Sequence, residues 1–273
     1  MDIIRKLAYA KLNLDLHVVR RRQDGFHELK SIVIPLDFYD EVYLEISNKN
    51  EVISNVQIKN NLVKRVIEEF QNRKHIDKNV KVTIYKKIPL ASGLGGGSAN
   101  AAAVINGIVE LFNLQLPPSE LEDIANKLGS DILFCLYNKP AIIQGRGDKL
   151  EFIDYPYFET ITLILLPTKN NTAEVFKNHK IKENRIDFKR QIELFSNKDP
   201  SKYLYNIKND LLESALKTNY TFDIYYQKIK EIAPNVMMSG SGPTLFIINS
   251  NKNAVERLKK LENIQVFDVK IKK

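Results

Sequence analysis

A glycine-rich stretch at residues 89–103, PLASGLGGGSANAAA, constrains the fold of this chain more than any other segment. An alternating strand pattern over residues 80–85 leads into it, and a helix pattern leaves it from about Ala99 to Phe112. A strand, a glycine-rich loop and a helix N-terminus together form a phosphate cradle, because unpaired N–H groups and the positive end of the helix dipole meet there. A glycine-rich turn without a ligand is the alternative, but the pattern on both sides favours an anion site.

Two common phosphate-binding motifs do not fit this loop. A Walker loop ends in Gly-Lys-Ser/Thr, whereas this loop reads Gly97-Ser98-Ala99 and has no lysine. A dinucleotide motif requires G-x-G-x-x-G and an acidic residue that ends the next strand. Here Ser98 takes the place of the last glycine, and the nearest acidic residue, Glu110, lies inside the helix pattern.

Length and composition indicate a globular protein of one large or two modest domains, with 273 residues and 44% hydrophobic content. The single cysteine, Cys135, cannot form an intrachain disulfide, and its apolar neighbours predict a role in core packing. We see no signal-peptide core and no stretch long enough to span a membrane, so we expect a cytoplasmic protein.

The net charge of +8 suits either nucleic acid or a phosphorylated small molecule as the partner. The only tight basic run is residues 20–22, and the other basic residues are scattered. Because such a distribution is more typical of a solvated surface than of a binding stripe, we expect no nucleic-acid partner.

The N-terminal segment, residues 7–19, alternates as one strand with Leu12 and Leu14 on the apolar face. Lys11 and Asn13 share the opposite face with Asp15 and His17 at two-residue spacing. A lysine on a strand is usually solvated, but a lysine and an asparagine on one face favour a functional site.

An Asp24-Gly25 turn follows this strand, and it presents Phe26 and His27 at or just beyond its tip. Such an aromatic residue beside a histidine serves either as a packing contact or as a platform for a base.

The remaining elements of the first half are strands at 31–36 and 41–47 and helices at 61–70 and 119–128. Asn61 is typical of a helix N-cap, and Ser119 with Glu122 matches a capping box. Asp131 enters an apolar run and taken alone fits a helix cap. The alternative is a carboxylate held near a partly dry pocket as a general base.

We place a domain boundary near Tyr155, which gives domains of residues 1–155 and 156–273. The second domain contains a strand at 160–166, a polar stretch to about Tyr203 that we expect to be helical and mobile, and further helices from Asn209. A second small-residue loop at 239–243 precedes a strand, a helix and a last strand. This order is compatible with a ferredoxin-like domain.

Three small-residue motifs in a fixed order resemble the GHMP kinase superfamily: AKLN at 10–13, the stretch 89–103 and SGSG at 239–242. A narrower resemblance rests on AKLN, DGFH at 24–27, GLGGGSANAA at 93–102 and GSD at 129–131. The resemblance covers the whole chain. It implies an α+β, two-domain fold with an N-terminal domain like domain 2 of ribosomal protein S5 and a ferredoxin-like C-terminal domain. Within the superfamily the motifs are most similar to the kinases that phosphorylate a cytidine-diphosphate-linked methylerythritol for isoprenoid synthesis.

The resemblance implies a role for each matching residue. Lys11 and Asp131 match the catalytic pair, and Asp131 would accept or orient the proton of the attacking hydroxyl. The substrate side would be formed by Asn13, Phe26, His27, Thr172 and Phe176, with the two phenylalanines on either side of the cytosine ring and His27 at its edge.

The cofactors implied by the resemblance are ATP and Mg²⁺. No pattern fixes the metal ligands, and Ser98 is a candidate. The residues expected at ATP are the loop and helix start, with two positions near the adenine: Pro89, Leu90, Ala91, Ser92, Gly93, Leu94, Gly95, Gly96, Gly97, Ser98, Ala99, Asn61 and Lys86.

Two departures from the family pattern affect these expectations. Phe26 stands where the family usually has tyrosine, so a hydroxyl is lost, and no proline follows Asp131. The alternatives are another GHMP kinase, similar to mevalonate or homoserine kinases, and an RNA-binding protein. The chain would act as a monomer or homodimer.

Overall fold

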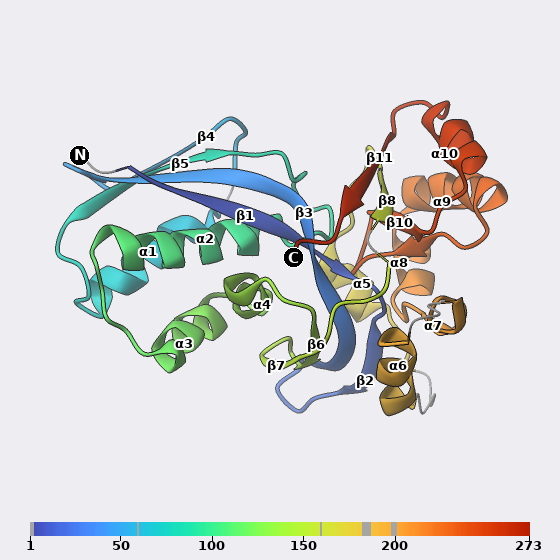
Figure 1. Cartoon of the computed structure of the whole chain (residues 1–273), viewed down its shortest axis with the longest axis horizontal. Helices are drawn as coiled ribbons and strands as arrows, with labels where there is room; N and C mark the ends of the chain where they lie inside the picture. Colours follow the sequence, from blue (N-terminus) through green and yellow to red (C-terminus); the bar gives the residue numbers. More distant parts are fainter. Residues whose placement is uncertain (1–2, 59, 159, 182–186, 198–200) are drawn as a thin grey trace. The chain divides into compact units, whose positions relative to one another are not determined.

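The computed structural model describes residues 3–58, 60–158, 160–181, 187–197 and 201–273, and the chain forms two compact units (Figure 1). Unit 1 comprises Met1–Lys11, Asp37–Leu90 and Gly95–Asn138, and unit 2 comprises Leu12–Leu36, Ala91–Leu94 and Lys139–Lys273. Each unit combines strands with helices, which confirms the expected α+β class. The boundary expected between residues 155 and 156 stays a prediction.

Unit 1 is built on the strands that lead into the glycine-rich loop. Residues 41–47 of β3 (His27–Ser47) pair antiparallel with β5 (Asn79–Tyr85), β4 (Glu51–Ser54) pairs parallel with β5, and β1 (Ile4–Asn13) also pairs with β3. The helices α1 (Leu62–Asn72) and α2 (Gly96–Leu111) lie on one side of these strands (Figure 1). The alternating residues of the strands are fully buried, as their pattern predicts: Val42, Leu44, Val80, Val82 and Ile84.

The N-terminal segment differs from the single strand predicted for residues 7–19. β1 ends at Asn13, and β2 (His17–Arg21) starts after a break. Residues 10–18 are buried on both faces, because the break is covered by protein from two sides. The main-chain N–H of Leu14 donates to Ile32 O at 2.9 Å, and that of Leu16 donates to Lys208 O at 2.9 Å.

Two strands predicted at 31–36 and 41–47 are one continuous strand, β3. The intervening residues include Phe38 and Tyr39, which favour extended backbone, and contain no glycine or proline. The start of β3 pairs with β2 and with β6 (Ala141–Gly145), which forms a hairpin with β7 (Lys149–Phe152).

The helix termini of unit 1 confirm one predicted cap and correct another. Asn61 caps α1, because its side chain accepts from the N–H of Val63 at 3.0 Å. The capping box predicted at Ser119 does not form. α3 (Pro118–Leu128) starts at Pro118, with Pro117 as the N-cap, because proline fits the first position of a helix.

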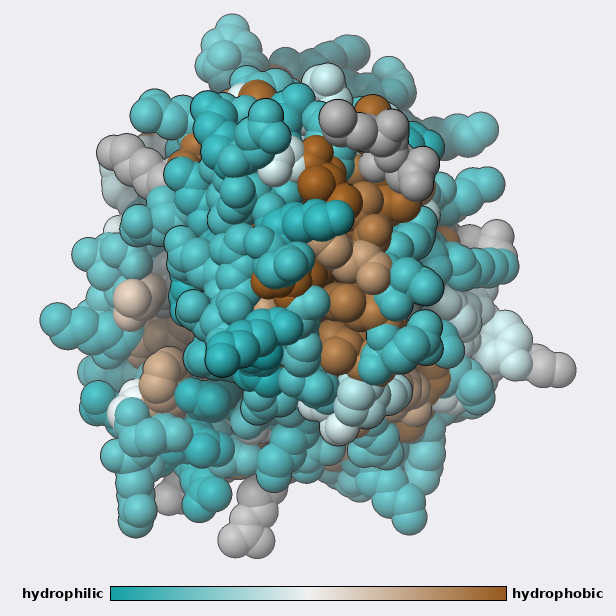
Figure 2. Space-filling model, turned by 90° about the vertical axis from the view of Figure 1, so that its left-hand side faces the viewer, coloured by the Kyte–Doolittle hydropathy of each residue, from teal (hydrophilic) through white to brown (hydrophobic). Residues whose placement is uncertain are grey.

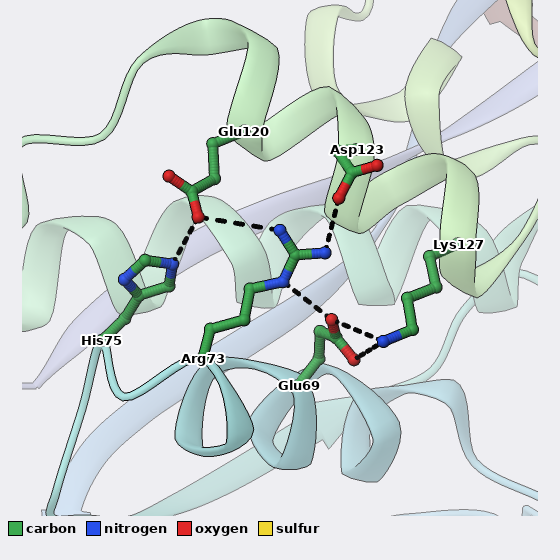
Figure 3. A network of polar contacts seen from close by, with 6 residues as sticks. All are labelled: Glu69, Arg73, His75, Glu120, Asp123 and Lys127. Carbon is green, nitrogen blue, oxygen red and sulfur yellow. Dashed lines mark hydrogen bonds and ion pairs between the residues drawn. The ribbon is translucent and has the colours of Figure 1, made fainter.

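A network of charged side chains joins α1 to α3 (Figure 3). Glu69 on α1 has a side chain only 7% exposed, and it contacts Arg73 and Lys127 at 2.7 Å each. Arg73 continues to Asp123 at 2.6 Å, and Glu120 contacts the ring of His75 at 2.8 Å. The pKa of Glu69 is lowered by hydrogen bonds from Lys127 and then from Arg73.

Unit 2 contains a four-stranded antiparallel sheet in the order β11-β8-β10-β9. Helices connect the first strand to the second and the third to the fourth, which is the β-α-β-β-α-β order of a ferredoxin-like domain and confirms that expectation. The sheet and its helices are β8 (Thr160–Leu165), β9 (Met237–Met238), β10 (Leu245–Ile248), β11 (Gln265–Lys270), α8 (Leu212–Thr218), α9 (Tyr220–Ile232) and α10 (Lys252–Lys259).

The polar stretch that begins after β8 is helical where it is described. It contains α5 (Thr172–Lys177), α6 (Phe188–Phe195) and α7 (Ser201–Asn206). Residues 182–186 and 198–200 lie outside the described residues, and the mobility expected of this stretch stays a prediction.

Hydrophilic residues cover most of the face shown in Figure 2, and apolar residues gather mainly in a band right of its centre, with a smaller group at the left. Among the described helices none is long and apolar enough to cross a membrane.

Replacing Glu69 with glutamine tests the α1–α3 network. Because its pKa is lowered in the folded state, the carboxylate stabilises the fold at neutral pH, and this contribution disappears as the pH falls through the folded-state pKa. We expect E69Q to lower the free energy of unfolding at pH 7 by about 1–3 kcal/mol, with a smaller deficit in acid. Urea denaturation at several pH values measures both effects. E256Q, in an exposed pair with Lys259, is the control and should change little.

Candidate active site

The residues expected to be catalytic, Lys11 and Asp131, lie together in unit 1. Lys11 is near the end of β1, its side chain is 8% exposed, and its Nζ lies 3.4 Å from Asp131 Oδ2. Asp131 stands at the N-cap position of α4 (Ile132–Tyr137), but its carboxylate makes no capping hydrogen bond there. Because the carboxyl is 37% exposed, a bound hydroxyl can reach it and donate its proton while the buried ammonium lies alongside.

The thiol of Cys135 is buried in α4, one turn after Asp131, which confirms its predicted role in packing. Burial raises the pKa of this thiol, and the neighbouring Asp131 carboxylate raises it further. The sole cysteine is therefore an inert core residue and not a candidate nucleophile.

The glycine-rich loop passes into α2 next to the stem of Lys11. Gly95 is the N-cap of α2 with a φ of +68°, and a Cβ added to it would lie 2.7 Å from Lys11 Cγ. Only glycine fits this backbone and this approach. A Cβ on Gly96 would lie 2.8 Å from Ile88 Cγ2, whereas one on Gly97 would meet nothing within 4 Å.

The first turn of α2 is suited to an anion. The helix begins at Gly96, three residues before the predicted start, so Gly96, Gly97 and Ser98 supply its first N–H groups. No side chain in the described part of the chain caps this terminus. These N–H groups and the helix dipole therefore favour a negatively charged ligand.

Lys86 has a structural partner that the sequence did not reveal. Its Nζ contacts the carboxylate of Asp40 and lies 3.1 Å from Asn100 Oδ1. The other oxygen of Asp40 accepts the N–H groups of Lys87 and Ile88 at 2.7 and 2.8 Å. This cluster braces the chain at the entry to the loop, and burial lowers the pKa of Lys86. The adenine contacts expected of Lys86 and Asn61 stay predictions.

In unit 2, Asn13 is held by two serines. Its main-chain N–H donates to Ser239 Oγ at 3.1 Å, and its Nδ2 donates to Ser31 Oγ at 2.8 Å. Asn13 is buried, so these contacts fix the orientation of its amide. The sequence placed Asn13 on the same face as Lys11 and gave no indication of Ser31.

The second small-residue loop lies beside Thr172. Asn170 Nδ2 donates to Ser241 O at 2.7 Å, and the hydroxyls of Thr172 and Ser241 are 2.8 Å apart. Gly242 has a φ of +74°, and a Cβ there would lie 2.7 Å from Asn170 Nδ2. Thr172, at the start of α5, is thereby tied to this loop.

The middle of the glycine-rich loop, Ala91–Leu94, packs in unit 2 against the same small-residue loop. A Cβ on Gly93 would lie 2.8 Å from Ser239 O, and Ser92 O accepts the N–H of Thr244 at 3.2 Å. The hydroxyls of Ser92 and Thr244 are buried and have no hydrogen-bond partner within the described residues. Buried hydroxyls of this kind fit a site that a polar ligand completes.

The aromatic residues expected at a base form two pairs in unit 2. The rings of His27 and Phe176 stack with centroids 5.3 Å apart. Phe26 is 56% exposed, and the Arg146 guanidinium lies 5.3 Å from its ring centroid. The pKa of His27 is lowered by burial, and further by His179 and Arg21. Arg146 was not identified from the sequence, and the glycines on either side of it were the available signal.

Comparisons with known proteins identify relatives along nearly the whole chain. Residues 61–139 match the model of the GHMP kinases N terminal domain. The 4-diphosphocytidyl-2-C-methyl-D-erythritol kinase of Clostridioides difficile is 34% identical over 98% of this chain and 96% of its own length. The enzymes of that name from Acetivibrio thermocellus and Bacillus subtilis are 35% and 32% identical, over 96% and 94% of this chain and 97% and 92% of their own lengths.

Solved structures share the fold. A crystal structure of 4-(cytidine 5'-diphospho)-2C-methyl-D-erythritol kinase aligns with a TM-score of 0.78 at 23% identity and covers 98% of this chain and 99% of its own. Homoserine kinase from Cytophaga hutchinsonii aligns with a TM-score of 0.74 at 18% identity and covers 99% of this chain and 95% of its own. Such structures support the two-domain GHMP kinase fold expected from the motifs.

Replacing Gly95 with alanine should destabilise the protein, whereas the same change at Gly97 should not. At Gly95 the positive φ and the 2.7 Å approach to Lys11 predict a loss of about 1–3 kcal/mol in the free energy of unfolding. At Gly97 the added methyl meets open space in a helical turn, so stability should be unchanged or rise by up to about 1 kcal/mol. Urea denaturation compares the two, and equal losses would contradict the geometry at Gly95.

Proposed function

Because this chain belongs to the 4-diphosphocytidyl-2-C-methyl-D-erythritol kinase family, we propose that it transfers a phosphoryl group from ATP to the 2-hydroxyl of the substrate that the family name states. The observation that carries the proposal is the pair of Lys11 and Asp131, 3.4 Å apart, with Gly95 at the start of α2 packed against the lysine stem. This arrangement places a base, a fixed cation and an anion-binding helix terminus in one unit.

Asp131 is the proposed general base. Its carboxylate would accept the proton of the attacking hydroxyl as the oxygen bonds to the transferred phosphorus and the bond to the leaving phosphate oxygen breaks. Lys11 would keep that carboxylate ionised and stabilise the charge that develops on the phosphoryl oxygens. The buried lysine stem fixes the ammonium before substrate arrives, so little reorganisation is needed during the reaction.

The triphosphate of ATP would bind at the first turn of α2. The N–H groups of Gly96, Gly97 and Ser98 point away from the helix and lack intrahelical acceptors. The unpartnered hydroxyl of Ser92, in unit 2, would be a donor to the substrate.

Mg²⁺ belongs to the proposal as a partner of the nucleotide. The described residues contain no cluster of three or more His, Cys, Asp or Glu side chains that could hold a metal alone. This fits a magnesium ion held mainly by nucleotide phosphates and by one or two protein oxygens, with Ser98 as the candidate ligand. When bound, the ion would neutralise phosphate charge.

The substrate side of the proposal uses the residues of unit 2. The rings of Phe26 and Phe176 and the edge of His27 would bind the cytosine, because stacking and edge hydrogen bonds are the usual means of holding a base. Asn13 and Thr172, each anchored to the second small-residue loop, would contact the remainder of the substrate.

Replacing Asp131 with asparagine tests the base. We expect kcat for phosphoryl transfer from ATP-Mg²⁺ to the named substrate to fall by about 10²–10⁴, with ATP affinity nearly unchanged, because the amide cannot accept the proton. D123N, which alters an exposed carboxylate in the network of Figure 3, is the matched control and should keep full kcat. Transfer that survives D131N would remove Asp131 from this role.

Replacing Phe176 with leucine tests the cytosine site. Loss of one stacking ring should raise KM for the cytidylyl substrate about tenfold, with KM for ATP unchanged. Leucine retains most of the packing of Phe176 against the core of unit 2. F152L, at a half-exposed ring on β7, is the control. CDP should compete with the substrate in the wild type. Absence of that competition would favour another GHMP kinase activity, similar to mevalonate or homoserine kinases.

A further inference from the structure

A buried histidine in unit 2 lies at ion-pair distance from two carboxylates and has no hydrogen bond to either. His17 is 4% exposed, and its Nε2 and Nδ1 lie 3.9 and 4.0 Å from carboxylate oxygens of Asp15 and Asp210. Neither ring nitrogen has a hydrogen-bond partner within the described residues, and the ring makes a T-shaped contact with Phe188 at a centroid distance of 5.8 Å. A buried polar side chain in this condition needs a physical reason, because leaving it unpaired costs stability.

The carboxylate on one side of His17 belongs to a chain of contacts that ends at Asn13. The Oδ1 atom of Asp15 accepts the N–H of Ile32 at 2.7 Å. The main-chain carbonyl of Asp15 accepts the hydroxyl of Ser31, which in turn accepts from Asn13 Nδ2 at 2.8 Å. The position of Asp15 therefore sets the orientation of the Asn13 amide.

The carboxylate on the other side begins a second chain of contacts that also reaches Asn13. Asp210 Oδ2 accepts the N–H of Val18 at 2.9 Å. The adjacent Asn209 donates from Nδ2 to Met238 O and Gly240 O, both at 2.8 Å, and so holds the small-residue loop. Ser239 of that loop accepts the main-chain N–H of Asn13 at 3.1 Å.

We propose that His17 is a positioning residue for Asn13, acting as a bridge between Asp15 and Asp210. The proposal rests on the proposed function, in which Asn13 contacts the substrate. His17 would hold the two carboxylates at a fixed separation. This would preserve the hydrogen bonds of Asn13 to Ser239, through its main-chain N–H, and to Ser31, through its side-chain amide. Its effect falls on substrate binding and not on phosphoryl transfer itself.

The charge of the ring matters for this bridge. A carboxylate only accepts hydrogen bonds, and a neutral imidazole presents one N–H and one lone pair, so it suits one carboxylate and repels the other. A protonated ring presents an N–H to both. The other titratable groups around it are Lys30, which is paired with His17 in the strand register, Lys208 beside Asp210, and Tyr203, whose hydroxyl donates to Asp15 at 3.4 Å.

The experiment compares H17Q with H75Q, which alters a histidine that contacts the Glu120 carboxylate in the network of Figure 3. We expect H17Q to raise KM for the cytidylyl substrate about tenfold, with kcat and KM for ATP within about twofold of the wild type. H75Q should leave all three unchanged.

A second measurement does not depend on turnover. The side-chain amide resonances of Asn13 should shift in H17Q, and not in H75Q, in the protein without substrate. If H17Q fails to fold, D210N takes its place. It removes one carboxylate charge, keeps an oxygen that can accept the N–H of Val18, and should shift the same resonances.

The outcomes separate the two proposals. A wild type that does not phosphorylate the cytidylyl substrate overturns the proposed function, and the Asn13 resonances then decide the role of His17. A functional wild type with unchanged KM in H17Q, or unchanged Asn13 resonances in H17Q or D210N, overturns the positioning role. A loss of kcat equal to the rise in KM would also overturn it.

Discussion

The burial of the Lys11 ammonium is the constraint on which the candidate site depends. A charge with so little exposure requires an opposite charge close by, and Asp131 supplies it at 3.4 Å. The stem of the lysine then fills the space beside the loop, and this forces glycine at position 95. Because Gly95 is the N-cap of α2, the same lysine that would act on the phosphoryl group also packs against the start of the helix proposed to bind phosphate.

Elsewhere in the chain, buried carboxylates fix the backbone by accepting hydrogen bonds from main-chain N–H groups. Asp40 binds two main-chain N–H groups and the ammonium of Lys86 at the entry to the loop, and Asp15 binds the N–H of Ile32. Each replaces a ladder hydrogen bond that irregular backbone cannot make. These carboxylates therefore hold the backbone at the entry to the glycine-rich loop and at the break that follows Asn13.

The parts of the site that the sequence predicted well are those determined by local patterns. The strand at β5, the glycine-rich loop and the helix after it follow from alternation, glycine content and a broad apolar stripe, and each is observed. The errors occur where tertiary contacts override such patterns. The break between β1 and β2 arises because residues 14–16 bond to β3 on one side and to residues 208–210 on the other. The start of α3 was set by Pro118 and not by the capping residues after it.

The sequence by itself determined the family, the two small-residue loops and which residue types could do the chemistry, because these depend on order along the chain. Only the tertiary structure decided which of those residues meet. In the folded chain Lys11 pairs with Asp131, 120 positions away in the sequence, and Lys86 pairs with Asp40. His17 lies between two carboxylates. The reason is that burial removes water as a partner, so each charge must find its counterpart among residues that are distant in sequence and close in space.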